Sequence, residues 1–127
     1  QSAGQMAQVV GIVDSYAYWP LVRQVFAQRV FRALEGEAAD EAEVEAGLAA
    51  APRVLGAFET IAAEGLVLDG SAVTLADLHL APMIDYFLMA PEGAAMMAGY
   101  PALSTWWRWI AERDSFRATR PVLGGAA

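Results

Sequence analysis

Three side chains that could take part in acid–base chemistry lie in one short stretch of the sequence, at Asp77, His79 and Asp85. A histidine beside a carboxylate is a common arrangement for moving a proton. Side chains on a helix meet when they are three or four residues apart, and neither aspartate has that spacing from His79. We therefore expect His79 to be a packed or partly exposed helix residue. Asp85 is expected to pair with an arginine such as Arg108 or Arg113.

Asp77 has a clearer structural role, because it stands three residues after Thr74. Threonine is a strong helix N-cap, and an acidic residue at the third helical position can return a bond to the backbone of the cap. This capping box predicts a helix over residues 75–89. The segment has few polar residues, so we expect it to be buried inside a bundle, with a bend at Pro82.

Other catalytic and metal-binding patterns are missing from the sequence. It has no nucleophile elbow, no phosphate-binding glycine loop and no paired-histidine motif. Without cysteine and with one histidine, a disulfide, thiol chemistry and a His/Cys metal cluster are excluded. We therefore predict no catalytic residue and no metal site. The tryptophans at 106, 107 and 109 could form a ligand-stacking platform, but their spacing favours a core role, with two pointing inward and one outward.

Length and composition predict a single domain over residues 1–127. The chain is 57% hydrophobic, and its formal net charge of −7 argues against nucleic acid or an anionic membrane as a partner. No apolar run approaches the roughly 18 residues of a membrane span. These features favour a soluble, cytoplasmic protein. The chain starts with Gln1 and enters a helical pattern almost at once, as we would expect of a segment from a longer polypeptide.

Helical periodicity covers the rest of the chain. Residues 6–31 predict one long helix or two in tandem, with a kink or boundary at Trp19 because Pro20 follows it. Asp40 is expected to cap a second helix that Pro52 bends and Gly65 ends. Residues 91–93 predict a turn, and residues 94–98 at most a short helix. Pro101 suits the first position of a further helix, and Ser115 could cap a last short turn. The fold class is therefore all-α, a bundle of about five or six helices around residues 75–89.

Two stretches resemble a known family. Residues 68–78, Leu-Asp-Gly-Ser-Ala-Val-Thr-Leu-Ala-Asp-Leu, are similar to the L-x-G-x-x-x-T/S-L-A-D-x signature in the helical C-terminal domain of cytosolic glutathione transferases. Residues 100–116 are similar to the Y-P-x-L-x-x-W-W-x-x-x-x-x-R-P-S ending of that domain, with Asp114 where the family usually has proline. Residues 19–36 resemble its long first helix, most like the phi and theta-like bacterial members. The resemblance covers nearly the whole chain.

The resemblance implies a share in conjugating glutathione to an apolar electrophile. In that family an N-terminal thioredoxin-like domain holds the glutathione and activates its thiol, and nothing in this sequence matches that domain. Glutathione would then be a co-substrate held mainly by the other domain, with no cofactor in this chain. We expect the chain alone to be inactive, and the intact protein to be a homodimer. The alternatives are a non-catalytic assembly module of the same fold and a small bundle that binds an apolar ligand.

The first helix carries the residues that we expect to bind the electrophile, namely Tyr16, Trp19 and Arg23. They are three and four residues apart, so they share a face if the helix is continuous. The resemblance implies that this part of the helix faces the glutathione sulfur and lines the apolar pocket. The competing interpretation is that Tyr16 and Trp19 fill the core beside Pro20.

Overall fold

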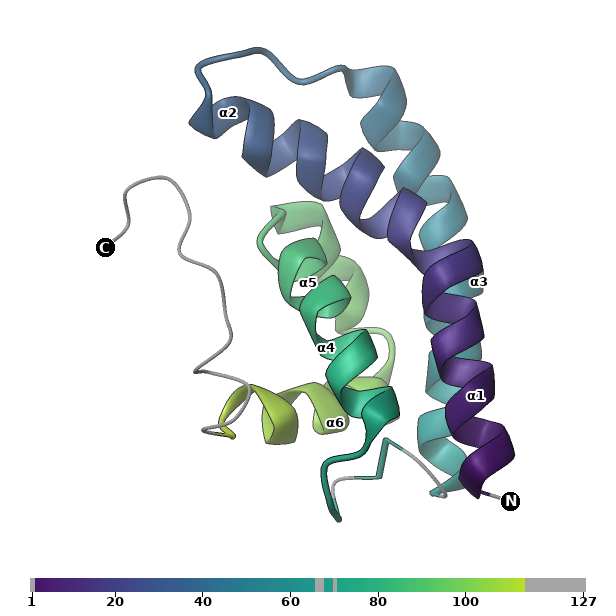
Figure 1. Cartoon of the computed structure of the whole chain (residues 1–127). Helices are drawn as coiled ribbons and strands as arrows, with labels where there is room; N and C mark the ends of the chain where they lie inside the picture. The colour runs from purple at the N-terminus through teal and green to yellow at the C-terminus, as the bar shows by residue number, and fades with distance from the viewer. Residues whose placement is uncertain (1, 66–67, 70, 114–127) are drawn as a thin grey trace.

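The computed structural model describes residues 2–65, 68–69 and 71–113. Its first layer is a pair of long helical arms. The first arm is continuous through α1 (Ser2–Ile12), η1 (Val13–Phe31) and the short α2 (Arg32–Leu34), and the second arm is α3 (Glu41–Glu64). Figure 1 shows the first arm curving along its length, with α3 running back beside it. Of the two predicted alternatives, one long helix or two in tandem, the structure shows the first, and no helix boundary falls at Trp19 or Pro20.

The middle of the first arm is a π-helix, in which backbone hydrogen bonds span five residues instead of four. At its end the N–H of Arg32 donates to the carbonyl of Ala27. This wider winding brings residues four apart into line. The four residues at the centre of its buried face follow that step: Val13, Ala17, Leu21 and Val25. A pattern counted at 3.6 residues per turn therefore misplaces side chains along η1.

The two arms approach closely where proline and glycine face each other. A Cβ atom added to Gly47 of α3 would lie 2.8 Å from the carbonyl oxygen of Pro20. Only glycine leaves room for that approach. The ends of α3 are as predicted: the Asp40 side chain accepts the N–H groups of Ala42 and Glu43, and Gly65 adopts a left-handed φ of 77°.

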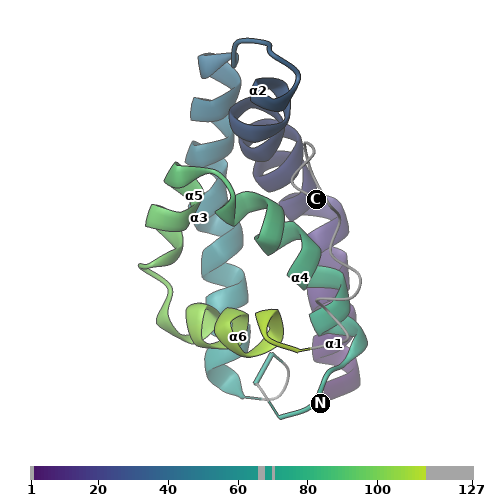
Figure 2. The same cartoon turned by 90° about the vertical axis from the view of Figure 1, so that its left-hand side faces the viewer.

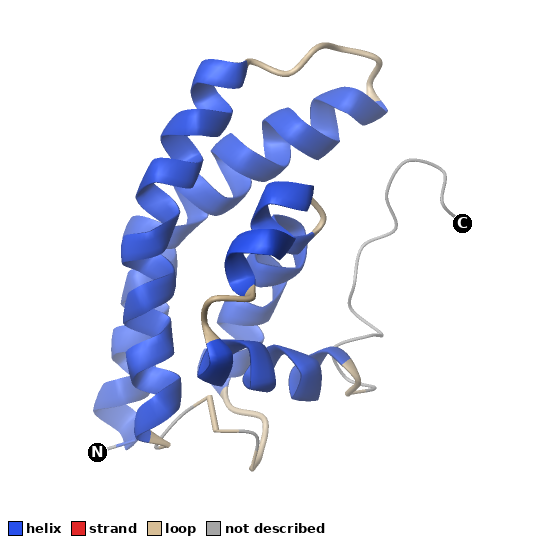
Figure 3. Cartoon of the chain, turned by 180° about the vertical axis from the view of Figure 1, so that it is seen from behind, coloured by secondary structure: helices blue, strands red, loops and turns tan. Residues whose placement is uncertain are grey.

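The second layer contains α4 (Leu75–Leu88), α5 (Pro91–Met97) and α6 (Pro101–Ala111). Figure 2 shows α4 in front of the two arms, with α6 crossing near its lower end. The predicted central helix is confirmed, with Met89 as its C-cap. Figure 3 shows only helix and loop over the described residues, and the fold class is all-α. Among those residues, no helix is both long enough and apolar enough to span a membrane.

Helix α5 corrects one expectation. Residues 91–93 were expected to form a turn, but the helix already begins at Pro91. A proline at the first helical position has its φ angle preset and lacks only an N–H that would have no partner there. Gly93 is thus inside the helix, where an added Cβ would lie 2.1 Å from the carbonyl oxygen of Phe87.

Helix α6 starts at Pro101, as predicted, but its cap comes from another helix. The Glu59 carboxylate of α3 accepts the backbone N–H of Ala102 at 3.0 Å and of Leu103 at 2.8 Å. A carboxylate at a helix N-terminus satisfies free donors and also suits the helix dipole. Glu59 therefore fixes α6 to the first layer. The predicted turn at Ser115 lies outside the described residues.

Candidate functional site

The capping box forms, and Asp77 also makes a hydrogen bond that the sequence did not indicate. Oδ2 of Asp77 accepts both the backbone N–H and the hydroxyl of Thr74 at 2.6 Å, and the pair has the reciprocal arrangement of a capping box. Oδ1 of the same carboxylate accepts the indole N–H of Trp106 at 2.7 Å. Asp77 is 1% exposed. A buried carboxylate with hydrogen-bond donors on both oxygens has a structural role, as expected.

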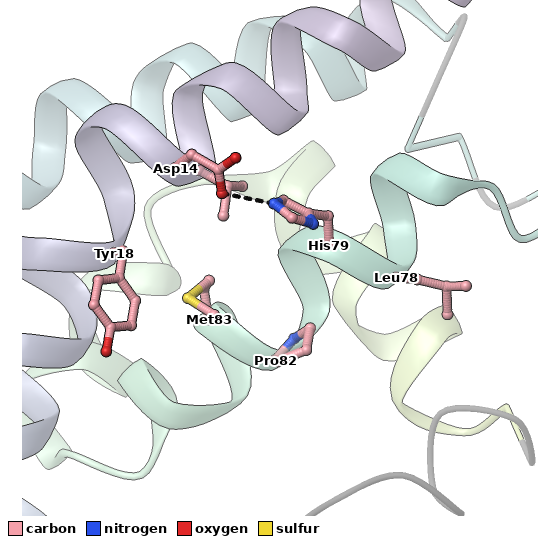
Figure 4. Close-up of a pocket in the computed structure, with 7 residues that line it drawn as sticks. Asp14, Tyr18, Leu78, His79, Pro82 and Met83 are labelled. Carbon is pink, nitrogen blue, oxygen red and sulfur yellow. Dashed lines mark hydrogen bonds and ion pairs between the residues drawn. The ribbon is translucent and has the colours of Figure 1, made fainter.

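His79 is partly exposed, as expected, but it has a partner that the sequence did not indicate. Its Nε2 lies 2.8 Å from Oδ1 of Asp14, which stands on η1, 65 residues earlier in the chain. No spacing rule within one helix could find this pair, because it depends on how η1 packs against α4. Figure 4 shows the two side chains facing each other between the helices.

The pair borders a hollow of about 320 Å³ between η1 and α4, which we call the η1–α4 hollow. Its lining is mostly apolar, and it comprises Val13, Asp14, Tyr18, Leu78, His79, Pro82 and Met83. In Figure 4, Tyr18 and Leu78 lie at opposite ends, and Pro82 and Met83 lie below the ion pair. Tyr18 is 40% exposed and Leu78 is 46% exposed, so apolar surface remains open at both ends.

The structure brings together two of the three residues expected to bind the electrophile. The guanidinium carbon of Arg23 lies 5.3 Å from the centre of the Trp19 ring, within cation–π distance. Both side chains belong to an outer row of η1, which comprises Ser15, Trp19 and Arg23 and faces away from the core. Trp19 is 56% exposed, so it does not fill the core of this chain.

Tyr16 lies on another side of η1. It is 67% exposed, and it lines a second hollow of about 350 Å³ against α3, together with Ile12, Arg53, Val54 and Ala57. The expected shared face assumed a helix of 3.6 residues per turn. The four-residue alignment of η1 keeps Trp19 beside Arg23 but turns Tyr16 away from them.

A charge network fastens the far end of η1 to α3 and α5. Arg29 makes ion pairs with Glu41 at 2.8 Å and with Glu92 at 2.7 Å. Hydrogen bonds from Arg29 lower the pKa of both carboxyl groups, and the two carboxylates raise the pKa of the Arg29 guanidinium. This network lies away from both hollows, and its role is to join three helices.

The tryptophans of α6 are core residues to different degrees. Trp106 is buried, whereas Trp107 and Trp109 are half-buried against the core. Asp85 is buried too. Arg108 donates to the hydroxyl of Thr105 at 3.3 Å, and Arg113 lies 5.1 Å from the centre of the Trp109 ring. The pairing of Asp85 with one of these arginines stays a prediction.

Comparison with known proteins identifies the class to which this fold belongs. Residues 17–114 match the family described as glutathione S-transferase, C-terminal domain. The chain belongs to this family, and the resemblance at the level of the domain is confirmed.

Individual relatives agree with that assignment. The chain is 29% identical over 111 residues to glutathione S-transferase F13 of Arabidopsis thaliana, covering 87% of this chain and 50% of the relative. It is 31% identical over 107 residues to glutathione S-transferase 3 of Zea mays, covering 84% and 48% respectively. The chain thus spans about half the length of these curated relatives. Both are plant proteins, so the bacterial type suggested by the sequence is not confirmed.

Solved structures share the fold. Glutathione S-transferase III in its apo form superposes with a TM-score of 0.79 at 28% identity, covering 94% of this chain and 56% of that one. Glutathione transferase F7 from Populus trichocarpa has a TM-score of 0.76 at 24% identity, covering 92% and 54%. The second likeness concerns the fold alone.

Proposed function

We propose that this chain is the helical half of a glutathione transferase-like enzyme, and that it forms the wall against which an apolar electrophile is held while glutathione attacks it. The observation that carries this proposal is the family match over residues 17–114. Curated relatives named glutathione S-transferase support it. These relatives favour the transferase-like function over an assembly module of the same fold.

The proposal divides the work between two domains. A thioredoxin-like domain would bind glutathione as co-substrate and lower the pKa of its thiol, so that the thiolate attacks the electrophile. The helical domain would orient the acceptor beside that sulfur, and correct placement of two reactants can supply much of the rate gain. We further propose a homodimer in the cytoplasm, of the phi- and theta-like type.

Trp19 and Arg23 are the proposed centre of the acceptor wall, with Tyr16 at its margin. The exposed indole offers a flat apolar surface with a polar edge, which suits conjugated electrophiles of varied shape. The guanidinium over the ring holds a positive charge nearby. A positive charge favours the negative charge that the acceptor gains when the thiolate adds to it.

Calorimetric titration of glutathione tests this division of labour. We expect no measurable heat of binding with the 127-residue chain, and binding once the thioredoxin-like domain is joined to it. Micromolar binding of glutathione by the 127 residues alone would overturn the proposal.

A further inference from the structure

Gly47 of α3 lies at a very close approach between the two long arms. It is buried, and a Cβ atom added to it would lie 2.8 Å from the carbonyl oxygen of Pro20, 2.8 Å from Cγ2 of Val25 and 2.9 Å from Cβ of Gln24. All three atoms belong to η1, and ordinary contacts of a Cβ atom begin at 3.4 Å. Glycine at this position therefore lets η1 lie closer to α3 than a residue with a side chain would allow.

The contact involves the backbone of η1, so turning a flexible side chain cannot relieve it. The Pro20 oxygen is a main-chain atom, the Cβ of Gln24 is fixed to its main chain, and Val25 is branched at Cβ and has few rotamers. A second tie lies one turn before Gly47 on α3, where Nε2 of Gln24 donates to Oε1 of Glu43 at 3.3 Å. These contacts fix where η1 crosses α3, and a methyl group added at the crossing must move the backbone of η1.

This crossing is adjacent to the residues proposed for the acceptor wall. Trp19 directly precedes Pro20 in the chain. In the same way, Arg23 directly precedes Gln24. Each of the two wall residues is thus joined by one peptide bond to a residue that an added Cβ on Gly47 would touch. A displacement of η1 at the crossing therefore displaces both Trp19 and Arg23.

The rest of α3 is tied to the second layer instead. Its Glu59 carboxylate accepts the N–H of Leu103 at 2.8 Å, which holds α3 and α6 together. A side chain at Gly47 would therefore push η1 away from a frame that includes α3 and α6. The acceptor wall would move with η1, by several tenths of an ångström if the contacts are to reach ordinary distances.

We propose that Gly47 is a positioning residue for the acceptor wall, and that its close approach to η1 determines where Trp19 and Arg23 stand and which electrophiles the wall accepts. The inference rests on the proposed function, because it takes these two residues as the wall. Small displacements matter when two bound molecules react, since a misplacement of about 1 Å can lower the rate about 100-fold.

Fluorine NMR of the two-domain protein labelled with fluorotryptophan tests the displacement without reference to activity. The resonance that disappears in Trp19→Phe is that of Trp19. We expect Gly47→Ala to shift this resonance. Gly56→Ala is the matched control, because it adds the same methyl group to α3 with nothing within 4 Å of it, and it should leave the resonance in place.

Further variants separate displacement from a loss of stability. Asp77→Ala weakens the second layer and should shift the resonance of Trp106, whose indole N–H donates to Asp77, but not that of Trp19. If Gly47→Ala does not fold, it is combined with Val25→Ala, which removes the clash with the valine methyl group and keeps the clash with the main-chain carbonyl. This double variant should shift the Trp19 resonance relative to Val25→Ala alone.

Steady-state kinetics then connect the displacement with specificity, using chlorodinitrobenzene as a flat electrophile and benzyl isothiocyanate as a more flexible one. We expect Gly47→Ala to lower kcat/KM for the flat electrophile about tenfold and to change the preference between the two. Glutathione affinity should equal that of Gly56→Ala, because the thioredoxin-like domain holds the glutathione.

The outcomes distinguish this inference from the function on which it rests. If Trp19→Ala changes the preference between the electrophiles and Gly47→Ala does not, Gly47 has no positioning role and the acceptor wall stands. If neither variant changes the preference, the acceptor wall is wrong and the inference fails with it. An unshifted Trp19 resonance in Gly47→Ala would overturn the inference alone.

Discussion

The indole N–H of Trp106 donates to Oδ1 of Asp77 at 2.7 Å, inside the core. The other oxygen of this carboxylate binds the backbone N–H and the hydroxyl of Thr74. One buried side chain therefore caps α4 and also ties α4 to α6. Because both oxygens are used, removing Asp77 should affect two helices instead of one.

Asp77→Ala should accordingly lower the free energy of unfolding by more than Thr74→Ala does. We expect about 1 kcal/mol for Thr74→Ala, the usual cost of a lost N-cap. Asp77→Ala should cost about 2 to 4 kcal/mol, since it removes the same cap and leaves the buried Trp106 donor without a partner. Urea denaturation of the chain measures both values. The two changes should be partly non-additive, because they act on one box. If the two variants lose the same free energy of unfolding, the hydrogen bond between Asp77 and Trp106 does not contribute to stability.

Gly93→Ala should be strongly destabilising. The added Cβ would lie 2.1 Å from the Phe87 carbonyl oxygen, a backbone atom that cannot move without disturbing the end of α4. We expect a cost of about 3 kcal/mol or more, at the upper end for overpacking. Gly56→Ala is the matched control: it lies inside α3 with nothing within 4 Å of the added Cβ, so it should stabilise the chain by about 0.5 to 1 kcal/mol. A Gly93→Ala variant with the midpoint of the parent would show that the approach of α5 to α4 is not tight.

The Arg29 network predicts how stability depends on pH. Hydrogen bonds from Arg29 lower the pKa of Glu41 and of Glu92 below the usual 4.5 in the folded chain. Their contribution is therefore fully present above pH 4.5 and is lost as the pH falls through the lowered values. The free energy of unfolding should decrease in that range, and Arg29→Gln should make the decrease shallower. Arg53→Gln is the control, and an equally shallow curve for it would remove the network as the cause. Asp69, whose pKa is lowered by hydrogen bonds from Ser71, should leave a residual slope in every variant.

The sequence predicts those contacts that join residues close together in the chain, and it does not predict those that join distant residues. The capping box at Thr74, the cap at Asp40 and the stop at Gly65 involve neighbours in the chain, and all three are confirmed. The cap of α6 by Glu59 and the pair of Asp14 with His79 join residues 43 or more apart, so only packing reveals them. Nothing in the sequence pattern separates π from α winding. Counting at 3.6 residues per turn therefore predicts one shared face for Tyr16 and Trp19, whereas in the structure Tyr16 faces α3 and Trp19 lies beside Arg23.

The Asp14–His79 pair should contribute little to stability. The Asp14 side chain is 63% exposed and that of His79 is 35% exposed, and ion pairs near the surface contribute about 1 kcal/mol or less. A double-mutant cycle with Asp14→Asn and His79→Gln, followed by thermal or urea unfolding, should give a coupling below that value. A coupling of several kcal/mol would instead identify the pair as a structural clamp between η1 and α4.

Steady-state kinetics of the two-domain protein test whether Trp19 belongs to the acceptor wall. Trp19→Ala is compared with Leu75→Ala, which removes an exposed apolar side chain at the start of α4, outside the outer row. We expect Trp19→Ala to change the KM for the electrophile or the preference among electrophiles, while glutathione affinity and Tm stay nearly constant. Leu75→Ala should leave all four quantities unchanged. If Trp19→Ala leaves electrophile KM and preference untouched, Trp19 does not belong to the acceptor wall.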